Sequence, residues 1–322
     1  MKNRILPSIL ALFLSLNLSA QLLVSEEPVT LNTETGSIFG TLKAPSGNNS
    51  PIPVAIIIAG SGPTDRNGNG QMTQNNAYKM LSDELFYNNI ATLCFDKRGI
   101  GESKAAMKDE SDIRFEQYID DVRQWIDLLA KDKRFSEVVI IGHSEGSLIG
   151  MIACENNPKA AKYISVAGMG VPLDEILKEQ LEKQLSTQPQ VVKDLVFSYI
   201  DKLKQGETIP DVPPTLNALF RPSVQSYLIS VFRYNPQVEI AKLTIPALII
   251  QGTTDIQVSA TQADLLADAN TKAKKEMIEN MNHVLKDCDS MDMQAQMPTY
   301  NNLTIPLNKK IGKVITDFIK GE

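Results

Sequence analysis

The chain has 322 residues, of which 43% are hydrophobic and 22% are charged, which is ample material for a large hydrophobic core. This composition excludes a disordered or fibrous protein. The net charge is −6 and the acidic and basic residues are interspersed, so the sequence presents no cationic face for nucleic acid or anionic lipid. The partner expected from this composition is a small, neutral or modestly polar molecule.

Residues 1–20 have the pattern of a secretory signal peptide. Two cationic residues precede the apolar run 5–18, and Leu18-Ser19-Ala20 forms a small-residue cleavage site. The apolar run is shorter than the roughly 20 residues that span a bilayer and contains polar residues, which argues against a membrane anchor. We therefore expect the mature chain to begin near Gln21 and to be exported, either to the periplasm or to the medium.

The next segments predict the sheet. Two strand-like stretches, 28–33 and 37–42, end at a turn-rich segment and predict an antiparallel edge. Short apolar runs then alternate with amphipathic patterns such as 115–130, which is typical of a mostly parallel sheet with helices on both faces. The predicted buried strands are 54–58, 90–95, 138–141, 163–166, 247–250 and a weaker 274–278.

Between residues 171 and 240 the alternation of strands and helices is interrupted. Apolar residues there fall at helical spacing in three blocks that prolines separate. We interpret 171–240 as a helical lid, or cap, inserted between two late strands, so that 21–170 and 241–322 form one α/β core. A last helix over 305–319 is expected to pack back on the sheet.

The strongest chemical motif is Gly142-His143-Ser144-Glu145-Gly146, a G-x-S-x-G between a predicted strand and a helix-compatible segment. A strand-turn-helix elbow of this kind holds the serine in a strained conformation, and small flanking residues permit the tight turn. The hydroxyl then projects at the carboxyl end of the strand, where the positive end of the next helix faces a developing oxyanion. The motif predicts Ser144 as a nucleophile.

Serine needs an adjacent base to act as a nucleophile. Of the two histidines in the sequence, His143 lies beside Ser144, where its side chain points away, so we expect it to be a packing residue. His283, after the last predicted strand, is therefore the predicted base. A carboxylate must orient that imidazole. Asp255, in the loop after a predicted strand, is better placed than Asp174, which is expected to begin a lid helix.

The oxyanion of an acyl-transfer intermediate needs two backbone N–H groups about 3 Å away. One is predicted to be the N–H of Glu145, which follows the nucleophile. The second is predicted to come from the loop 59–69 after the first buried strand. Pro63 has no N–H, which leaves Ser61 or Gly62, and the position within the loop favours Ser61.

A metal or nucleotide site is not predicted from this loop. The segment 65–70 matches the first half of a calcium-binding loop, but Asn76 stands where a bidentate Glu is needed. The Gly60-Ser61-Gly62 stretch hints at a dinucleotide-binding loop, but Asp65 occupies the position of the third glycine.

Together these motifs resemble the α/β-hydrolase superfamily, and more narrowly its lid-bearing bacterial carboxylesterases, which are grouped with serine aminopeptidase-like (S33-type) hydrolases. The resemblance implies an α/β-hydrolase fold and activity on esters of short to medium acyl chains, with neither a metal nor an organic cofactor. It rests on the elbow, the Asp255 and His283 loops, the loop 60–69 and Phe95-Asp96-Lys97-Arg98-Gly99-Ile100-Gly101-Glu102-Ser103. In the last segment we interpret Asp96 and Arg98 as an ion pair that orders the loop.

The function predicted is a two-step acyl transfer, in which Ser144 attacks an ester carbonyl and water then hydrolyses the acyl-enzyme. Two alternatives stay open: a serine aminopeptidase, for which Glu145 could supply one ammonium-binding carboxylate, and a non-catalytic binding protein that keeps the fold. The natural substrate and the oligomeric state are not indicated by the sequence. Lid aromatic residues are expected to shape the pocket, namely Phe220, Tyr227, Phe232 and Tyr234.

Overall fold

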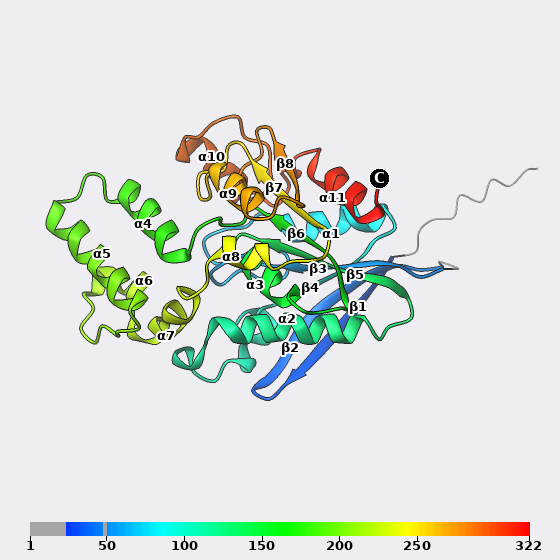
Figure 1. Ribbon diagram of the computed structural model, residues 1–322, viewed down its shortest axis with the longest axis horizontal. Helices are drawn as coiled ribbons and strands as arrows, with labels where there is room; N and C mark the ends of the chain where they lie inside the picture. The colour runs from blue at the N-terminus through cyan, green and yellow to red at the C-terminus, as the bar shows by residue number, and fades with distance from the viewer. Residues whose placement is uncertain (1–23, 48–49) are drawn as a thin grey trace, which may run out of the picture.

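A computed structural model describes residues 24–47 and 50–322, so the expected signal peptide lies outside the described residues. The described chain forms one eight-stranded sheet in the order β1-β2-β4-β3-β5-β6-β7-β8, flanked by helices (Figure 1). The strands are β1 (Val24–Thr33), β2 (Gly36–Pro45), β3 (Ile52–Ile58), β4 (Ala91–Phe95), β5 (Phe135–His143), β6 (Ala160–Val166), β7 (Ala247–Gly252) and β8 (Lys274–Ile278). The helices are α1 (Ala77–Tyr87), η1 (Gly101–Ala106), η2 (Glu110–Asp112), α2 (Phe115–Leu129), α3 (Glu145–Cys154), α4 (Leu173–Gln184), α5 (Gln190–Lys204), η3 (Pro214–Leu216), α6 (Asn217–Phe220), α7 (Pro222–Val231), α8 (Pro236–Ala241), α9 (Thr261–Ala269), α10 (Met293–Tyr300) and α11 (Ile311–Lys320).

The direction of the strands agrees with the sequence pattern. β2 runs antiparallel to both of its neighbours, β1 and β4, which confirms the predicted antiparallel edge. All neighbouring pairs from β4 to β8 are parallel. Parallel strands end at a common edge, so the loops after β3, β5, β7 and β8 meet on one side of the sheet.

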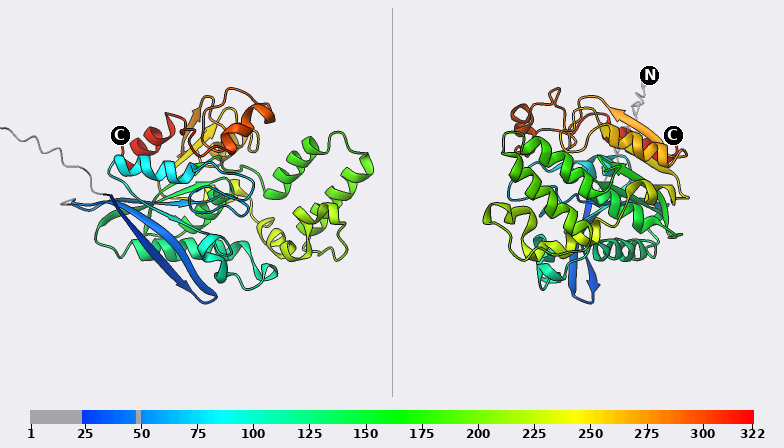
Figure 2. Two further views of the ribbon diagram at one scale, coloured as in Figure 1. Left: turned by 180° about the vertical axis from the view of Figure 1, so that it is seen from behind. Right: turned by 60° about the vertical axis from the view of Figure 1, so that its left-hand side comes forward.

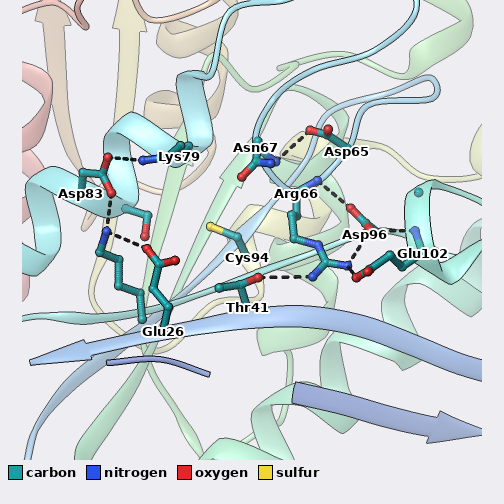
Figure 3. A pocket seen from close by; sticks show the side chains of 13 residues that line it. Glu26, Thr41, Asp65, Arg66, Asn67, Lys79, Asp83, Cys94, Asp96 and Glu102 are labelled. Carbon is teal, nitrogen blue, oxygen red and sulfur yellow. Dashed lines mark hydrogen bonds and ion pairs between the residues drawn. The ribbon is translucent and has the colours of Figure 1, made fainter. Parts of the chain in front are cut away.

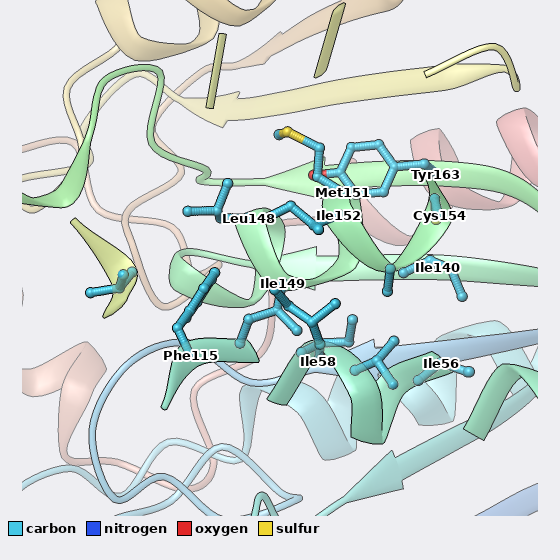
Figure 4. Packing of buried hydrophobic residues seen from close by; sticks show 14 of the residues in the cluster. Ile56, Ile58, Phe115, Ile140, Leu148, Ile149, Met151, Ile152, Cys154 and Tyr163 are labelled. Atoms are coloured by element: carbon cyan, nitrogen blue, oxygen red, sulfur yellow. The ribbon is translucent and has the colours of Figure 1, made fainter. Parts of the chain in front are cut away.

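The central strand β3 is buried on both faces because its residues alternate between two hydrophobic clusters. Ile56 and Ile58 pack with Phe115 of α2 and Ile149 of α3 (Figure 4). Its odd-numbered residues, such as Ile57, belong to a second cluster formed with α1 and α11. Burial on both faces explains why this strand is a continuous apolar run rather than an alternating one.

Helices α4 to α8 come between β6 and β7 in the chain, and α4 to α7 project from one side of the sheet (Figures 1 and 2). Polar contacts hold α7 against the core. The Phe115 N–H donates to Ser230 Oγ at 2.8 Å, and Arg221 Nε donates to Glu110 Oε2 at 2.8 Å. None of the helices in residues 24–47 and 50–322 has both the length and the apolar character that crossing a bilayer requires.

The last helix begins later than predicted. The sequence pattern favoured a helix over 305–319, but α11 spans Ile311–Lys320. Before the helix, Leu307 instead forms a β-bridge with Lys286, and the Asn308 N–H donates to the Leu285 carbonyl at 2.8 Å. Residues 307–308 therefore hold the loop that carries His283 in place.

Candidate active site

Ser144 lies at a sharp turn between β5 and α3. Its backbone has φ 54° and ψ −121°, a conformation that costs a non-glycine residue about 1–3 kcal/mol. A Cβ atom on Gly142 would lie 2.2 Å from the Gly146 carbonyl oxygen, and one on Gly146 would lie 2.4 Å from the Ile58 carbonyl oxygen. Only glycine fits at these two positions, because the turn folds onto itself and presses against the end of β3.

Asp255 and His283 follow the neighbouring strands β7 and β8 and contact each other. His283 Nδ1 lies 2.7 Å from Asp255 Oδ2, and their side chains are 6% and 0% exposed. Asp255 Oδ1 accepts the N–H groups of Gln257 at 2.8 Å and Val258 at 2.9 Å, while Gln251 Nε2 donates to Oδ2 at 3.1 Å. Burial alone would raise the pKa of Asp255, but the contact with His283 and the two N–H donors outweigh it and hold the pKa below its usual value.

Ser144 and His283 line the same cavity, which has a volume of about 160 Å³. The ring of His283 lies 4.8 Å from that of His143, the residue before the serine. Asp174, the alternative acid, is instead paired with Lys204 at 2.7 Å. The fold thus brings together the three residues that the sequence predicted as nucleophile, acid and base, and their roles remain a prediction.

His143 links this cavity to its surroundings through both ring nitrogens. Its Nε2 lies 2.8 Å from the His283 carbonyl oxygen, and its Nδ1 lies 2.8 Å from the Tyr78 hydroxyl. Because a carbonyl can only accept, Nε2 carries the proton and Nδ1 accepts from Tyr78. The Tyr78 oxygen accepts in turn from the Gly60 N–H at 3.0 Å. Burial, together with nearby His283, lowers the pKa of His143 to about 3, so this ring stays neutral.

The two predicted oxyanion donors flank the nucleophile. A Cβ atom on Gly60 would lie 3.0 Å from Ser144 Cβ, so the Gly60–Ser61 peptide passes close to the serine. The N–H of Glu145 belongs to the first turn of α3, where helices leave their N–H groups unpaired. Within residues 24–47 and 50–322, neither the Ser61 nor the Glu145 N–H has a hydrogen-bond acceptor. Both groups are therefore available to a ligand.

Sequence reasoning gave no role to Lys97 or Tyr78. Lys97 follows β4 and is buried, and its ammonium donates to the Gly60 carbonyl at 2.5 Å. Glu145 Oε2 lies 3.7 Å from the same ammonium, and the Tyr227 hydroxyl of α7 donates to Glu145 Oε1 at 2.5 Å. The sequence feature that could have indicated Lys97 is its position two residues after β4, a strand that ends at the same edge of the sheet as β5. No signal in the sequence pointed to Tyr78.

The expected ion pair between Asp96 and Arg98 is absent, which corrects the prediction. Asp96 pairs with Arg66 at 2.7 Å, and Arg98 pairs with Asp121 of α2 at 2.5 Å. Each of the two residues therefore pairs with a residue from a different element, Asp96 with the loop after β3 and Arg98 with α2. Figure 3 shows that Arg66 reaches Asp96 and Glu102 together, which ties the loop after β3 to the loop after β4.

The cavity drawn in Figure 3 has a volume of about 600 Å³ and is lined largely by charged side chains that already have partners. Lys43 is paired with Glu26 at 3.1 Å and Asp83 at 2.5 Å. Asp65 accepts the N–H groups of Asn67 at 2.8 Å and Asn69 at 2.9 Å, so its carboxylate shapes its own loop. These contacts give the cavity a structural role.

The four aromatic residues expected to shape the pocket have different roles. Phe220 and Phe232 are 0% and 1% exposed and belong to the hydrophobic core. The Tyr234 hydroxyl donates to Glu116 at 3.1 Å. Tyr227 alone of the four lines a cavity beside the elbow, one of about 220 Å³ that Lys97 and Glu145 also line.

The sheet order, the strained elbow and the residues after β5, β7 and β8 define the class of fold: the chain has an α/β-hydrolase fold. A family model described as "Serine aminopeptidase, S33" matches residues 69–213. "Esterase EstD" of Thermotoga maritima is 25% identical over 264 residues, which cover 81% of this chain. The matched part spans 60% of the length of that esterase.

Solved structures agree on the fold. Est1E from Butyrivibrio proteoclasticus superimposes with a TM-score of 0.58 and 16% identity, covering 91% of this chain and 99% of that one. The Pyrococcus furiosus esterase Pf2001 gives a TM-score of 0.59 and 13% identity, covering 92% of this chain and 91% of that one. At these low sequence identities, the structural similarity establishes the shared fold and nothing about activity.

Proposed function

We propose that this protein is a serine hydrolase that cleaves carboxylic esters of short to medium acyl chains. Ser144 attacks the carbonyl as His283 takes its proton, Asp255 stabilises the imidazolium, and the Ser61 and Glu145 N–H groups receive the oxyanion. The alcohol leaves with a proton from His283, and water then releases the acid from the acyl-enzyme. The single observation that carries the proposal is the 2.7 Å contact between His283 and a buried Asp255, beside a cavity that the strained Ser144 also lines.

The size of the cavity and the named relatives support an ester with a small acyl group. The cavity that Ser144 and His283 line has a volume of about 160 Å³, below the usual range for drug-sized ligands. The relative from Thermotoga maritima is named an esterase, and so is the solved Pyrococcus furiosus structure described above.

The test is the hydrolysis of p-nitrophenyl esters from acetate to decanoate by the purified protein. We expect turnover to be highest for the shorter chains and to fall by at least about a thousandfold in Ser144→Ala and His283→Ala. Ser186→Ala, at an exposed serine in the turn after α4, is the matched control and keeps wild-type turnover. Unchanged turnover in either active-site variant rejects the assignment.

The aminopeptidase alternative needs a free carboxylate to hold the ammonium of a peptide N-terminus. Glu145 is the acidic side chain next to the nucleophile, but Lys97 and Tyr227 already occupy its two oxygens. We therefore expect alanine p-nitroanilide to be hydrolysed far more slowly than p-nitrophenyl butyrate. The reverse preference would establish the peptidase.

A binding protein without catalysis would keep the fold but leave the serine unreactive. We expect a fluorophosphonate probe to label the wild-type protein at Ser144, as peptide mass spectrometry would show, and to leave Ser144→Ala unlabelled. We also propose that the predicted segment 171–240, which forms α4 to α7 and all but the last residue of α8, acts as a lid. Val224 and Tyr227 of α7 support this, because both line the 220 Å³ cavity beside the elbow.

A further inference from the structure

Lys97 is an almost completely buried cation. Its side chain is 4% exposed and lies at the end of β4, in the loop that faces the loop after β3. A buried ammonium is unfavourable unless hydrogen bonds and an opposite charge compensate it. Burial lowers the pKa of Lys97, while the Glu145 carboxylate opposes that effect. The contacts of this ammonium therefore have to compensate the cost of its burial.

The Lys97 ammonium lies closer to the Gly60 carbonyl oxygen, at 2.5 Å, than to Glu145 Oε2, at 3.7 Å. That carbonyl belongs to the peptide unit whose N–H is the N–H of Ser61. The C=O and N–H of a trans peptide point in opposite directions and share one delocalised system. A charged donor on the oxygen therefore both fixes the direction of the N–H and makes it a stronger donor.

The other side of Gly60 is fixed as well. Its N–H donates to the Tyr78 hydroxyl at 3.0 Å, so the residue is held at both of its backbone polar groups. The close approach of Gly60 to Ser144, 3.0 Å for a Cβ placed on the glycine, sets this peptide beside the nucleophile. A small rotation of the Gly60–Ser61 peptide would move the N–H away from the oxyanion.

The counter-ion of Lys97 is the residue that is predicted to supply the other oxyanion N–H. Glu145 supplies the first oxyanion N–H from its backbone, and its carboxylate lies 3.7 Å from the Lys97 ammonium. We propose that Lys97 is a positioning residue that orients and polarises the Gly60–Ser61 peptide, with Glu145 as the counter-ion that joins the two halves of the oxyanion hole. This inference rests on the proposed esterase function.

The same ion pair connects the site to the inserted helices. The Tyr227 hydroxyl of α7 donates to Glu145 Oε1, and the Lys97 ammonium lies 5.3 Å from the centre of the Tyr118 ring of α2. The titratable groups that line the same cavity as this ammonium are Glu145 from α3, Tyr227 from α7 and Tyr118 from α2. Glu110 and Arg221 also line it and pair with each other. The neighbouring Arg98 is engaged by Asp121. The state of the oxyanion hole thus depends on where α7 sits.

The experiment compares kcat and KM for p-nitrophenyl butyrate in wild type, Lys97→Met and Lys97→Arg, using the full chain. Loss of one oxyanion donor lowers kcat by about a hundredfold or more, so we expect a fall of about tenfold to a hundredfold in Lys97→Met, with KM within about twofold. Lys97→Arg should recover part of kcat. Lys104→Met, at an exposed lysine in η1, is the matched control and keeps wild-type values.

A pH profile separates positioning from a merely structural role. The wild type should lose kcat at alkaline pH as Lys97 loses its proton, and Lys97→Met should lack this limb. Glu145→Gln keeps the backbone N–H but removes the counter-ion, so its alkaline limb should move to lower pH. This second variant also keeps the test valid if Lys97→Met fails to fold.

The outcomes are distinct. An unchanged kcat in folded Lys97→Met, or alkaline limbs that coincide in all three proteins, overturns the inference. A raised KM with unchanged kcat also overturns it, because Lys97 would then be binding substrate. If the wild type hydrolyses no ester and the fluorophosphonate does not label Ser144, it is the proposed function that fails.

Discussion

At the scale of single residues, neutral His143 connects the loop that carries Gly60 to the loop that carries His283. Its position before the nucleophile made it a predicted packing residue, and its ring is indeed only 8% exposed. Each hydrogen bond in the chain from Gly60 through Tyr78 and His143 to the His283 carbonyl has only one possible direction. These uncharged hydrogen bonds therefore fix two loops of the candidate site.

Substitution of Tyr78 by Phe removes the middle of that chain. The Gly60 N–H and His143 Nδ1 both lose their partner, so we expect the free energy of unfolding to fall by about 1–3 kcal/mol. We also expect kcat to fall by about tenfold, because the oxyanion loop is less well fixed. Urea denaturation and ester kinetics measure the two effects. Tyr87→Phe, at the exposed end of the same helix, is the control, and equal results in the two variants contradict the prediction.

Replacement of Asp255 by Asn tests the acid directly. The amide cannot stabilise the imidazolium and favours the wrong tautomer of His283, so we expect kcat to fall by about 10⁴-fold with the fold retained. Asp174→Asn, which removes the partner of Lys204, should keep kcat within about twofold. Ester kinetics together with circular dichroism check both. If Asp174→Asn is the variant that loses activity, the acid has been misassigned.

Residues whose chemistry is tied to a local motif could be predicted from the sequence, whereas residues that act across the fold could not. Ser144 stands in a five-residue pattern, and the scarcity of histidine left one candidate for the base. Tyr78 and Lys97 meet Gly60 only after α1 and β4 have packed beside β3. The spacing of these residues in the sequence does not indicate that they contact one another.

At the scale of helices and strands, apolar periodicity predicted the sheet well because its strands are buried on both faces. All six predicted parallel strands correspond to strands β3 to β8. Helix α10 (Met293–Tyr300) was not predicted, since Met293 and Met297 are exposed and the helix contains Pro298. The late start of α11 could not be foreseen because it depends on pairing with a distant loop.

The contact between α3 and α8 contains a carboxyl group that responds to pH. Burial, and then the neighbouring Glu239, raise the pKa of Glu155 from 4.5 to about 7, although Lys242 lies 3.5 Å away. Between these two values the folded state holds a proton that the unfolded state has lost, so stability decreases as pH rises through this range.

We therefore expect Glu155→Gln to be more stable than wild type at pH 8 and equal to it at pH 4. The gain should be about 1 kcal/mol after allowance for solvent screening, as urea denaturation at both pH values would measure. Glu179→Gln, at an exposed carboxylate on α4, is the control and should show no such pH dependence. A gain that is equal at both pH values contradicts the linkage.

At the scale of the whole molecule, the order of the strands decides where the site forms. The chain places β4 on one side of β3 and β5 on the other, so the loops after β3 and β5 separate at that point and leave room for a ligand. Asp255 and His283 follow β7 and β8, which lie two and three strands beyond β5 in the sheet. The sequence predicted the convergence of these loops at one edge, but the order of the strands depends on pairings between distant segments.

Export is a prediction about the whole chain that follows from residues 1–20. If the leader is a signal peptide, expression of the full chain in a bacterium should yield a protein in the periplasm or medium whose N-terminus is Gln21. N-terminal sequencing of the fractionated protein measures this. Ala20→Arg, which removes the small residue at the cleavage site, should retain the leader. An uncleaved wild-type chain in the cytoplasm refutes the prediction.

The ammonium of Lys204 donates to Asp174 Oδ1 at 2.7 Å and to the Phe232 carbonyl at 2.6 Å, so the two ends of the helical insert meet at one side chain. Because the two ends of the insert lie close together, we expect that an insert of another length could replace it without displacing β6 or β7. The entropic cost of closing a loop grows only slowly with its length. If the insert is the proposed lid, we expect replacement of this one contiguous stretch to change the substrate range while the codons for the strands stay as they are.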